Sequence, residues 1–175
     1  MGKYFDELKK SMDWLAEKNN TFFLGQAVGY PGTAMSNTLK DVPVCKKLEM
    51  PVTEEMQMGA SIGMALNNTV PISIYPRWNF LLLAVNQLVN HLDKLPVLAG
   101  VAPKVIIRTS VGSERPLNPQ AQHTGDFTES FRNMLTTVSV VRLFEASDIF
   151  PSYQMAYSRP GSTILVEYGD FYNEK

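Results

Sequence analysis

The sequence predicts an α/β domain with three layers, in which a parallel β-sheet carries helices on both faces. Short apolar runs closed by Gly or Pro alternate along the 175 residues with longer segments of helical periodicity, and this alternation is typical of a parallel sheet. The run at residues 104–109, Lys-Val-Ile-Ile-Arg-Thr, has no polar alternation at its centre. Such runs are typical of strands that are buried on both sides. We therefore expect one domain over residues 1–175.

The first elements follow directly from this pattern. Apolar side chains recur every three or four residues over 3–18, which indicates an amphipathic helix. An apolar strand is expected at 21–24, and a loop rich in Gly and Pro at 26–33. Residues 42–50 are expected to be strand-like, and Cys45 within them is expected to be a packed, unreactive thiol.

A helix is expected next over residues 54–67, with Thr53 as its N-cap. On this helix Gly59 and Gly63, together with Ala60, leave one face nearly bare. Another backbone can therefore approach that face closely.

The remaining elements continue the alternation of strands and helices. Strands are expected at 69–75, 104–109, 136–144 and 162–168, and helices at 79–92 and from Ser147, as N-cap, to residue 157. The polar segment 110–125 is longer than a routine connection between elements, so we expect it to be a functional loop.

Composition excludes several classes of function. A net charge of −1 without a long Lys/Arg cluster predicts no binding of nucleic acid or of an anionic membrane. No apolar run approaches the roughly 20 residues of a membrane span, and no signal core is present, so we expect a cytoplasmic protein. Two histidines and one cysteine predict no zinc site. The glycine-rich nucleotide loops and the serine-hydrolase elbow are also absent.

One segment carries a specific resemblance. Residues 51–65, Pro-Val-Thr-Glu-Glu-Met-Gln-Met-Gly-Ala-Ser-Ile-Gly-Met-Ala, resemble the segment that holds the cofactor-activating glutamate in transketolase-type pyrimidine-binding domains, such as those of pyruvate dehydrogenase beta subunits. Further similar segments follow in the family's order: Phe-Phe-Leu-Gly at 22–25, Asn-Gln-Leu-Val-Asn at 86–90 with Asn in place of the family's Asp, Val-Ile-Ile-Arg at 105–108, Ala-Gln-His-Thr at 121–124, and Ile-Leu-Val-Glu at 164–167. Their common order and spacing make the resemblance specific.

The resemblance implies that the chain serves a thiamine-diphosphate (ThDP) enzyme, and it implies roles for three residues. Glu54 stands where the family keeps the glutamate that hydrogen-bonds the ring nitrogen N1′ of the cofactor's aminopyrimidine. Phe80 takes the place of the aromatic residue that stacks on that ring. His123 matches the loop histidine that faces the substrate.

The glutamate has a definite chemical task in this family. The cofactor's own amino group must take up the thiazolium proton, and a carboxyl that shares a proton with N1′ makes that amino group a better base. Sharing a proton requires a carboxyl that is withdrawn from water beside an apolar ring. We expect Phe80, Met56 and Met58 to supply this dry surrounding.

Each of these residues also has a purely structural interpretation. Acidic residues such as Glu54 and Glu55 are favoured in the first turn of any helix. An aromatic residue at a helix start, like Phe80, is usually part of the core. His91 is expected to be a surface residue or a cation near a helix C-terminus. Arg77-Trp78 and Arg115 are expected to line the entrance and bind a substrate carboxylate or phosphate, with solvated surface as the alternative.

The family's diphosphate and magnesium module is missing from the sequence. That module is marked by Gly-Asp-Gly followed further on by Asn, whereas this chain has only Gly169-Asp170-Phe171 near its end. We therefore expect Mg²⁺ and the diphosphate to be bound by an alpha-type partner chain, in an α₂β₂ assembly with an apolar, methionine-containing interface. The sequence also ends where the pyrimidine-binding domain ends, so we expect a stand-alone beta-type chain.

The expected function is that of the pyrimidine-binding subunit of a split ThDP enzyme, active only with its partner. It would cleave or form C–C bonds at a 2-oxo acid or ketose, as a decarboxylase, a transketolase-like enzyme or a carboligase. A non-catalytic regulatory or structural partner that kept the fold is one alternative, although such a copy is expected to lose Glu54, Phe80 or His123. A flavodoxin-like domain is another, although residues 26–32 are a poor phosphate cradle.

Overall fold

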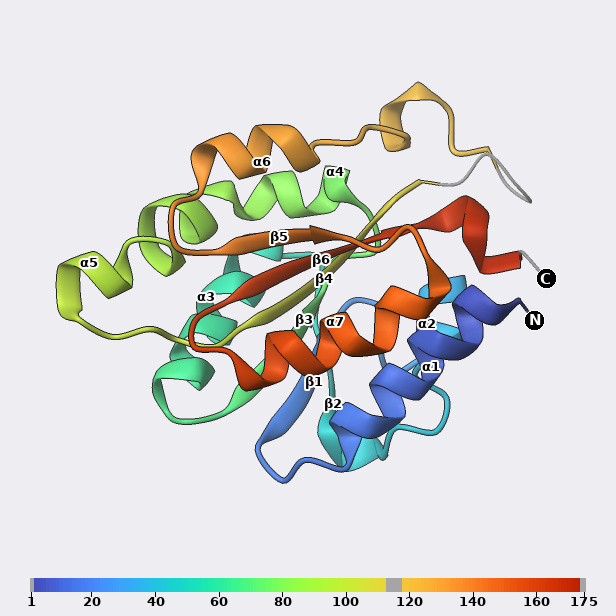
Figure 1. The fold of residues 1–175 in the computed structure, drawn as a ribbon, viewed down its shortest axis with the longest axis horizontal. Helices are drawn as coiled ribbons and strands as arrows, with labels where there is room; N and C mark the ends of the chain where they lie inside the picture. The colour runs from blue at the N-terminus through green and yellow to red at the C-terminus, as the bar shows by residue number, and fades with distance from the viewer. Residues whose placement is uncertain (1, 113–117, 174–175) are drawn as a thin grey trace.

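A computed structural model shows a six-stranded, all-parallel sheet with helices on both faces, which confirms the predicted fold class (Figure 1). The structure describes residues 2–112 and 118–173. The strands are β1 (Thr21–Gly25), β2 (Lys47–Glu49), β3 (Val70–Ile74), β4 (Ile106–Val111), β5 (Ser139–Arg142) and β6 (Thr163–Tyr168), in the order β2-β1-β3-β4-β6-β5. The helices are α1 (Lys3–Ala16), α2 (Ala34–Asn37), α3 (Glu54–Leu66), α4 (Trp78–Leu81), α5 (Leu95–Ala99), α6 (Thr128–Met134) and α7 (Ala146–Ser158).

The sheet separates two apolar cores. Helices α1, α2 and α7 pack on one face, and α3, α4 and α6 pack on the other (Figure 1). In β6, Leu165 belongs to the first core, whereas Ile164 and Val166 belong to the second. Successive side chains of a strand point to opposite faces. A strand in this position therefore needs apolar residues at consecutive positions, which explains the unbroken apolar runs of the sequence.

The prediction of a strand over residues 42–50 is wrong for most of that range. Pro43 precedes a 3₁₀ turn at Val44–Lys46, and only Lys47–Glu49 form β2. This strand lies at the edge of the sheet and pairs with β1 alone, so little in the sheet holds the preceding residues extended. Cys45 is consequently exposed, and the expectation of a packed thiol is corrected.

Two helices differ from the expected form. The segment 79–92, expected to be one α-helix, instead contains three short helical elements of different type. These are α4, a 3₁₀ turn at Leu82–Ala84 and a π-helix at Gln87–Leu92. Helix α7 begins one residue before Ser147, with Glu145 at the N-cap, so Ser147 lies inside the first turn and does not cap the helix.

Asp93 fastens the end of the π-helix to the start of β5. Its side chain is fully buried, and its Oδ1 accepts hydrogen bonds from the backbone N–H groups of Thr136 (2.9 Å), Thr137 (2.7 Å) and Val138 (3.0 Å). Lys94 Nζ lies 2.8 Å from Oδ2. Burial by itself raises the pKa of this carboxyl, but Lys94 and the N–H donors outweigh it and hold the pKa of Asp93 well below its usual value of 3.8.

Replacing this carboxylate tests its importance for the fold. Asp93→Asn is expected to lower the free energy of unfolding by about 3 kcal/mol at pH 7, because a charged acceptor of several hydrogen bonds is lost. Since the pKa of Asp93 is lowered in the folded state, its contribution is complete above pH 3.8 and is lost as the pH falls below that value. Urea unfolding over this pH range should show the difference between the two proteins shrinking.

Asp148→Asn is the matched control for this experiment, because Asp148 is exposed in the first turn of α7. It should cost less than about 1 kcal/mol. Equal unfolding free energies for the wild-type chain and Asp93→Asn at pH 7 would contradict the role of Asp93.

No helix within residues 2–112 and 118–173 combines the length and the apolar character that crossing a membrane requires.

Candidate functional site

A cavity of about 370 Å³ opens at the carboxyl ends of three central strands. Gln26 directly follows β1, Pro76 and Arg77 follow β3, and Ser110 and Gly112 lie at the end of β4, all in the wall of this cavity. The chain leaves β1 toward β2 on one side and returns to β3 on the other, so the strand order reverses here. Ligand sites of open parallel sheets form at this kind of switch point.

Glu54, the first residue of α3, contacts Gln26 in the wall of this cavity. Its side chain is largely withdrawn from water, with the residue 4% exposed. Gln26 Nε2 donates a hydrogen bond to Glu54 Oε1 at 3.0 Å, and the Tyr75 hydroxyl lies 3.4 Å from the Glu54 backbone oxygen. Burial raises the pKa of Tyr75, so its hydroxyl stays a neutral donor. The neighbouring Glu55 is exposed.

The first turn of α3 is held against the sheet by one buried amide. Gln57 Nε2 donates to the Ile74 backbone oxygen (2.9 Å) and contacts Ser73 Oγ (3.1 Å) at the end of β3. Thr53 is the N-cap residue, as predicted, but its side chain makes no capping hydrogen bond to the helix. The first turn of α3 is therefore held on the sheet by Gln57 and not capped by the threonine side chain.

Phe80 and His123 lie together, although they are far apart in the sequence. Their rings stack with centroids 5.4 Å apart and planes 28° apart. Phe80 is half-buried and lines the cavity together with Gln26 and Arg77, so it is not a core residue. His123 belongs to a short 3₁₀ turn at Ala121–His123, and its Nδ1 is buried with no hydrogen-bond partner in the part of the chain that the structure describes.

Of the two arginines expected at the entrance, the structure describes only Arg77. Arg77 is half-buried in the cavity wall, and this burial lowers its pKa. Arg115 lies outside the described residues. The residue after Arg77, Trp78, is fully buried and packs on Phe131 with ring centroids 4.7 Å apart, so it belongs to the core and not to an entrance.

The two methionines near Glu54 do not form a joint apolar wall. Met58 is fully buried in the second core, whereas Met56 is 52% exposed. Met56 instead lines a shallow hollow of about 410 Å³ together with Glu54, Val52 and Leu83. The polar residue Gln26, which the sequence analysis did not single out, is the side chain that contacts the Glu54 carboxyl.

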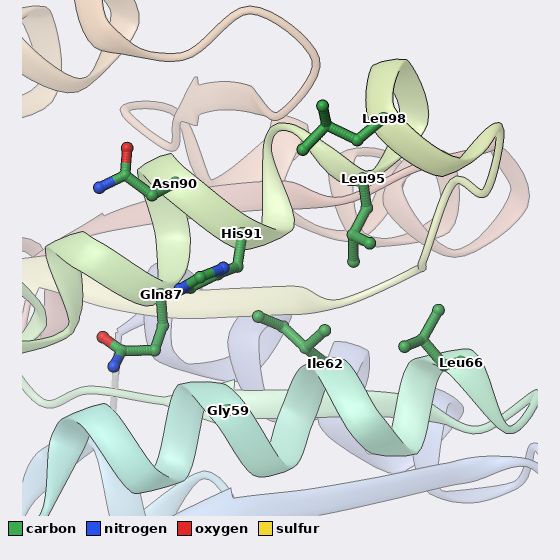
Figure 2. A pocket seen from close by; sticks show the side chains of 8 residues that line it. All are labelled: Gly59, Ile62, Leu66, Gln87, Asn90, His91, Leu95 and Leu98. Carbon is green, nitrogen blue, oxygen red and sulfur yellow. The ribbon is translucent and has the colours of Figure 1, made fainter.

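A further groove of about 340 Å³ runs between α3 and the segment 87–98 (Figure 2). Its walls are mostly apolar: Gly59, Ile62, Leu66, Gln87, Asn90, His91, Leu95 and Leu98. His91 is exposed there, as expected for a surface residue. In the described parts of the chain, no side chain or backbone atom beyond the adjoining backbone of α3 and the neighbouring residues lies within 4 Å of a Cβ placed on Gly59 or Gly63. The bare face of α3 is thus open in this chain.

Comparison with known proteins agrees with the resemblance found in the sequence. The chain is 32% identical over 127 residues to the pyruvate dehydrogenase E1 component subunit beta of Gracilaria tenuistipitata var. liui, covering 69% of this chain and 38% of that protein. It is 28% identical over 137 residues to the same subunit of Cyanidium caldarium, covering 74% of this chain and 41% of that protein. The match therefore spans well under half of these relatives. No protein-family model matches the sequence.

A solved structure described as a split gene transketolase, inactive beta4 tetramer, has the same fold. It superposes with a TM-score of 0.74 over 95% of this chain and 51% of its own, at 16% sequence identity. The chain belongs to the family of pyruvate dehydrogenase E1 beta subunits, and it has the fold of the split gene transketolase structure.

Gly25 brings the two central strands of this pyrimidine-binding domain together at the switch point. Its φ of +154° is unfavourable for other residues, and a Cβ here would lie 2.4 Å from the Ile74 backbone oxygen. The loop that follows is held by the Glu49 carboxylate, which accepts hydrogen bonds from the N–H groups of Ala27 (2.6 Å) and Gly29 (2.7 Å). Gln26 is thereby fixed between two anchored neighbours. The glycine that closes the apolar run at 21–24 was the available sequence signal for this site.

A pair of glycine substitutions tests this description. Gly25→Ala is expected to lower the free energy of unfolding by about 2 kcal/mol, because the methyl group overlaps a backbone oxygen of β3. Gly59→Ala in the interior of α3 is the matched control, and it should raise the free energy of unfolding by up to about 1 kcal/mol. Urea unfolding of the isolated chain measures both. A neutral Gly25→Ala would show that the close approach of β1 and β3 is not needed.

Proposed function

We propose that this chain is the pyrimidine-binding, beta-type subunit of a ThDP-dependent enzyme that cleaves or forms C–C bonds at a 2-oxo acid or ketose. The observation that carries the proposal is the buried Glu54 carboxyl, which accepts a hydrogen bond from Gln26 in the wall of the switch-point cavity. Perturbed or buried acidic groups in such clefts are typical of functional sites. The relationship to pyruvate dehydrogenase E1 beta subunits supports the same role.

The residues present fit an aminopyrimidine ring. A buried carboxyl and a buried imidazole nitrogen both favour further polar partners, and His123 Nδ1 has none within the described residues. Glu54 would bind the ring nitrogen, and Phe80 would offer aromatic surface in the cavity wall. Phe80 is already held by its stacking on His123, so it is a rigid platform. His123 would face the substrate from the long polar loop.

When bound, ThDP would supply a nucleophilic thiazolium carbon and an electron sink for the negative charge that develops on the substrate. Glu54 holds a proton at the ring nitrogen, and its burial keeps water from competing for that proton. His123 accepts or donates a proton at the substrate, since histidine is suited to both roles near neutral pH. Arg77, and Arg115 from the long loop, would bind an anionic group of the substrate, because a guanidinium pairs well with carboxylate or phosphate.

We also propose that an alpha-type partner with Gly-Asp-Gly and a later Asn binds the diphosphate and Mg²⁺, in an α₂β₂ assembly. Exposed apolar residues follow α3 and its neighbours: Val52, Met56, Leu66, Leu83, Val97 and Leu98. Val52, Met56 and Leu83 border the hollow at Glu54, and Leu66 and Leu98 border the groove of Figure 2. Patches of this kind mark protein interfaces. A partner on this surface would also cover Glu54, which supports a site shared between two chains.

The similar split gene transketolase structure is of an inactive beta4 tetramer. By analogy, this chain is expected to be inactive until its partner is present. Gel filtration of the mixed chains tests the assembly, and amide hydrogen exchange in α3 should slow when the complex forms. Unchanged exchange in α3 within a formed complex would place the interface elsewhere.

Substitution of the carboxyl tests the proposed chemistry. In the complex with the partner chain, Glu54→Gln should reduce kcat by about 100-fold or more, because an amide cannot share a proton with the ring nitrogen. Glu55→Gln is the matched control one residue away, and its exposed side chain predicts turnover within twofold of wild type. Pyruvate decarboxylation and ketose cleavage are the two assays. If Glu54→Gln retains full turnover, Glu54 does not have this role; if the wild-type complex binds no ThDP, the chain is a non-catalytic partner.

The proposed role of Arg77 is tested by the KM for the substrate, because Arg77 is not expected to bind the cofactor. Arg77→Ala should raise the KM for a 2-oxo acid by about tenfold or more, because an anion loses a partly dehydrated guanidinium. The affinity for ThDP should stay within twofold. Arg132→Ala, on the exposed surface of α6, is the control. An unchanged KM in Arg77→Ala would assign Arg77 to the solvated surface.

A further inference from the structure

The Glu54 carboxyl has a dedicated polar neighbour. Gln26 Nε2 donates to Glu54 Oε1 at 3.0 Å across 28 residues of sequence. Gln26 is half-buried at the carboxyl end of β1, and Glu54 is almost fully buried at the start of α3. A hydrogen bond to a carboxyl so withdrawn from water is stronger than one on the surface.

The backbone conformation on both sides of Gln26 restricts the direction of its side chain. Gly25 lies against β3, where even a methyl group would overlap the Ile74 oxygen. On the other side Ala27 is in the left-handed conformation, with φ 56°, and its N–H is bound by the Glu49 carboxylate. Gln26 lies between these two fixed residues. Its amide is therefore preorganised toward Glu54, as positioning groups of functional sites are.

Gln26 also lines the cavity that Phe80 and Arg77 line. One side chain thus contacts the Glu54 carboxyl and borders the space where a ligand would lie. An amide neither gains nor loses a proton near neutral pH, and it offers N–H donors to a carboxylate. It can therefore occupy one carboxyl oxygen without competing for the proton that Glu54 is proposed to hold.

We propose that Gln26 is the positioning residue for Glu54: it holds Oε1, so that Oε2 is the oxygen offered to the ring nitrogen. This inference rests on the proposed function for its catalytic consequence, but the contact itself is a property of the chain alone. Gln26 acts through Glu54 and does not touch the reacting atoms.

The contact is tested first without cofactor or partner. In the ¹H–¹⁵N spectrum of the labelled isolated chain, the side-chain amide signals of Gln26 should move when Glu54 is replaced in Glu54→Ala. The signals of Gln154, exposed on α7, should not move. Gln26 signals that stay in place would overturn the inference, whatever the complex does.

The consequence is tested in the assembled complex with three variants. Gln26→Met keeps the length and removes the donor, so kcat should fall by about tenfold, with the KM for the 2-oxo acid unchanged. Gln26→Glu puts a second carboxyl beside Glu54, and since two adjacent carboxyls ionise with difficulty, the acid limb of the pH–kcat profile should move up by about one pH unit. Gln154→Met is the control and should match wild type.

Each result separates positioning from a structural role. Wild-type kcat in Gln26→Met, or a loss of turnover that only follows a fall in Tm, would overturn the proposal. A lowered kcat with an unchanged Tm and a shifted pH profile in Gln26→Glu would support it. A wild-type complex that binds no ThDP would remove the proposed function, and the spectrum of the isolated chain would still decide whether Gln26 holds Glu54.

Discussion

The buried ion pair between Arg108 and Glu167 joins the centre of the sheet to its surroundings. Both side chains are fully buried, Arg108 in β4 and Glu167 in β6, and the guanidinium donates through Nε and Nη2 to both carboxylate oxygens. Burial opposes the charge of Arg108, but the attraction of Glu167 outweighs it and raises the pKa of Arg108. Removing either partner would leave an uncompensated buried charge, which is among the most destabilising changes in a core.

Three hydroxyl groups complete this ion pair and connect it to the site. Arg108 Nη1 donates to Thr38 Oγ1 (2.8 Å), beyond α2, and the Tyr153 hydroxyl of α7 donates to Glu167 (2.9 Å). The Tyr172 hydroxyl donates to the other Glu167 oxygen, and Tyr172 also lines the switch-point cavity. Burial raises the pKa of both tyrosines well above 10, so they stay neutral donors. One wall of the cavity is thus fixed by a buried ion pair and its neutral hydroxyl donors.

The elements that the sequence predicted correctly are those whose local residue pattern has one physical cause. The central strands were predicted because burial on both faces demands apolar residues at consecutive positions, as in β4 and β6. Helix α6 was missed because it is short. Asp126, two residues before the helix begins, was an available sequence signal, and in the structure its Oδ1 accepts a hydrogen bond from the Thr128 N–H at 2.9 Å. The edge position of β2, which left Cys45 exposed, depends on the order of the strands and not on local sequence.

In the candidate site, too, the features that depend on tertiary contacts could not be predicted from local sequence. Glu54, Phe80 and His123 were predicted as site residues through the resemblance alone, since an acidic residue in a first helical turn has an ordinary structural explanation. The stacking of Phe80 on His123 and the bond from Gln26 to Glu54 join residues that are distant in sequence, so no local pattern could indicate them. The expectation that Met56 and Met58 both shield the carboxyl failed because they are two residues apart on a helix, where such residues face different sides.

The exposure of Met56 has its own physical meaning beside a buried acid. Glu54 is withdrawn from water by its own chain, yet the hollow that it lines is bordered by the apolar side chains of Val52, Met56 and Leu83. An apolar partner surface placed there would remove the remaining water from the rim of the carboxyl. Desolvation disfavours a free carboxylate and favours one that shares a proton. In the proposed enzyme, assembly and proton sharing are therefore coupled: the partner that would grip the phosphates would also complete the surroundings in which Glu54 does its chemistry.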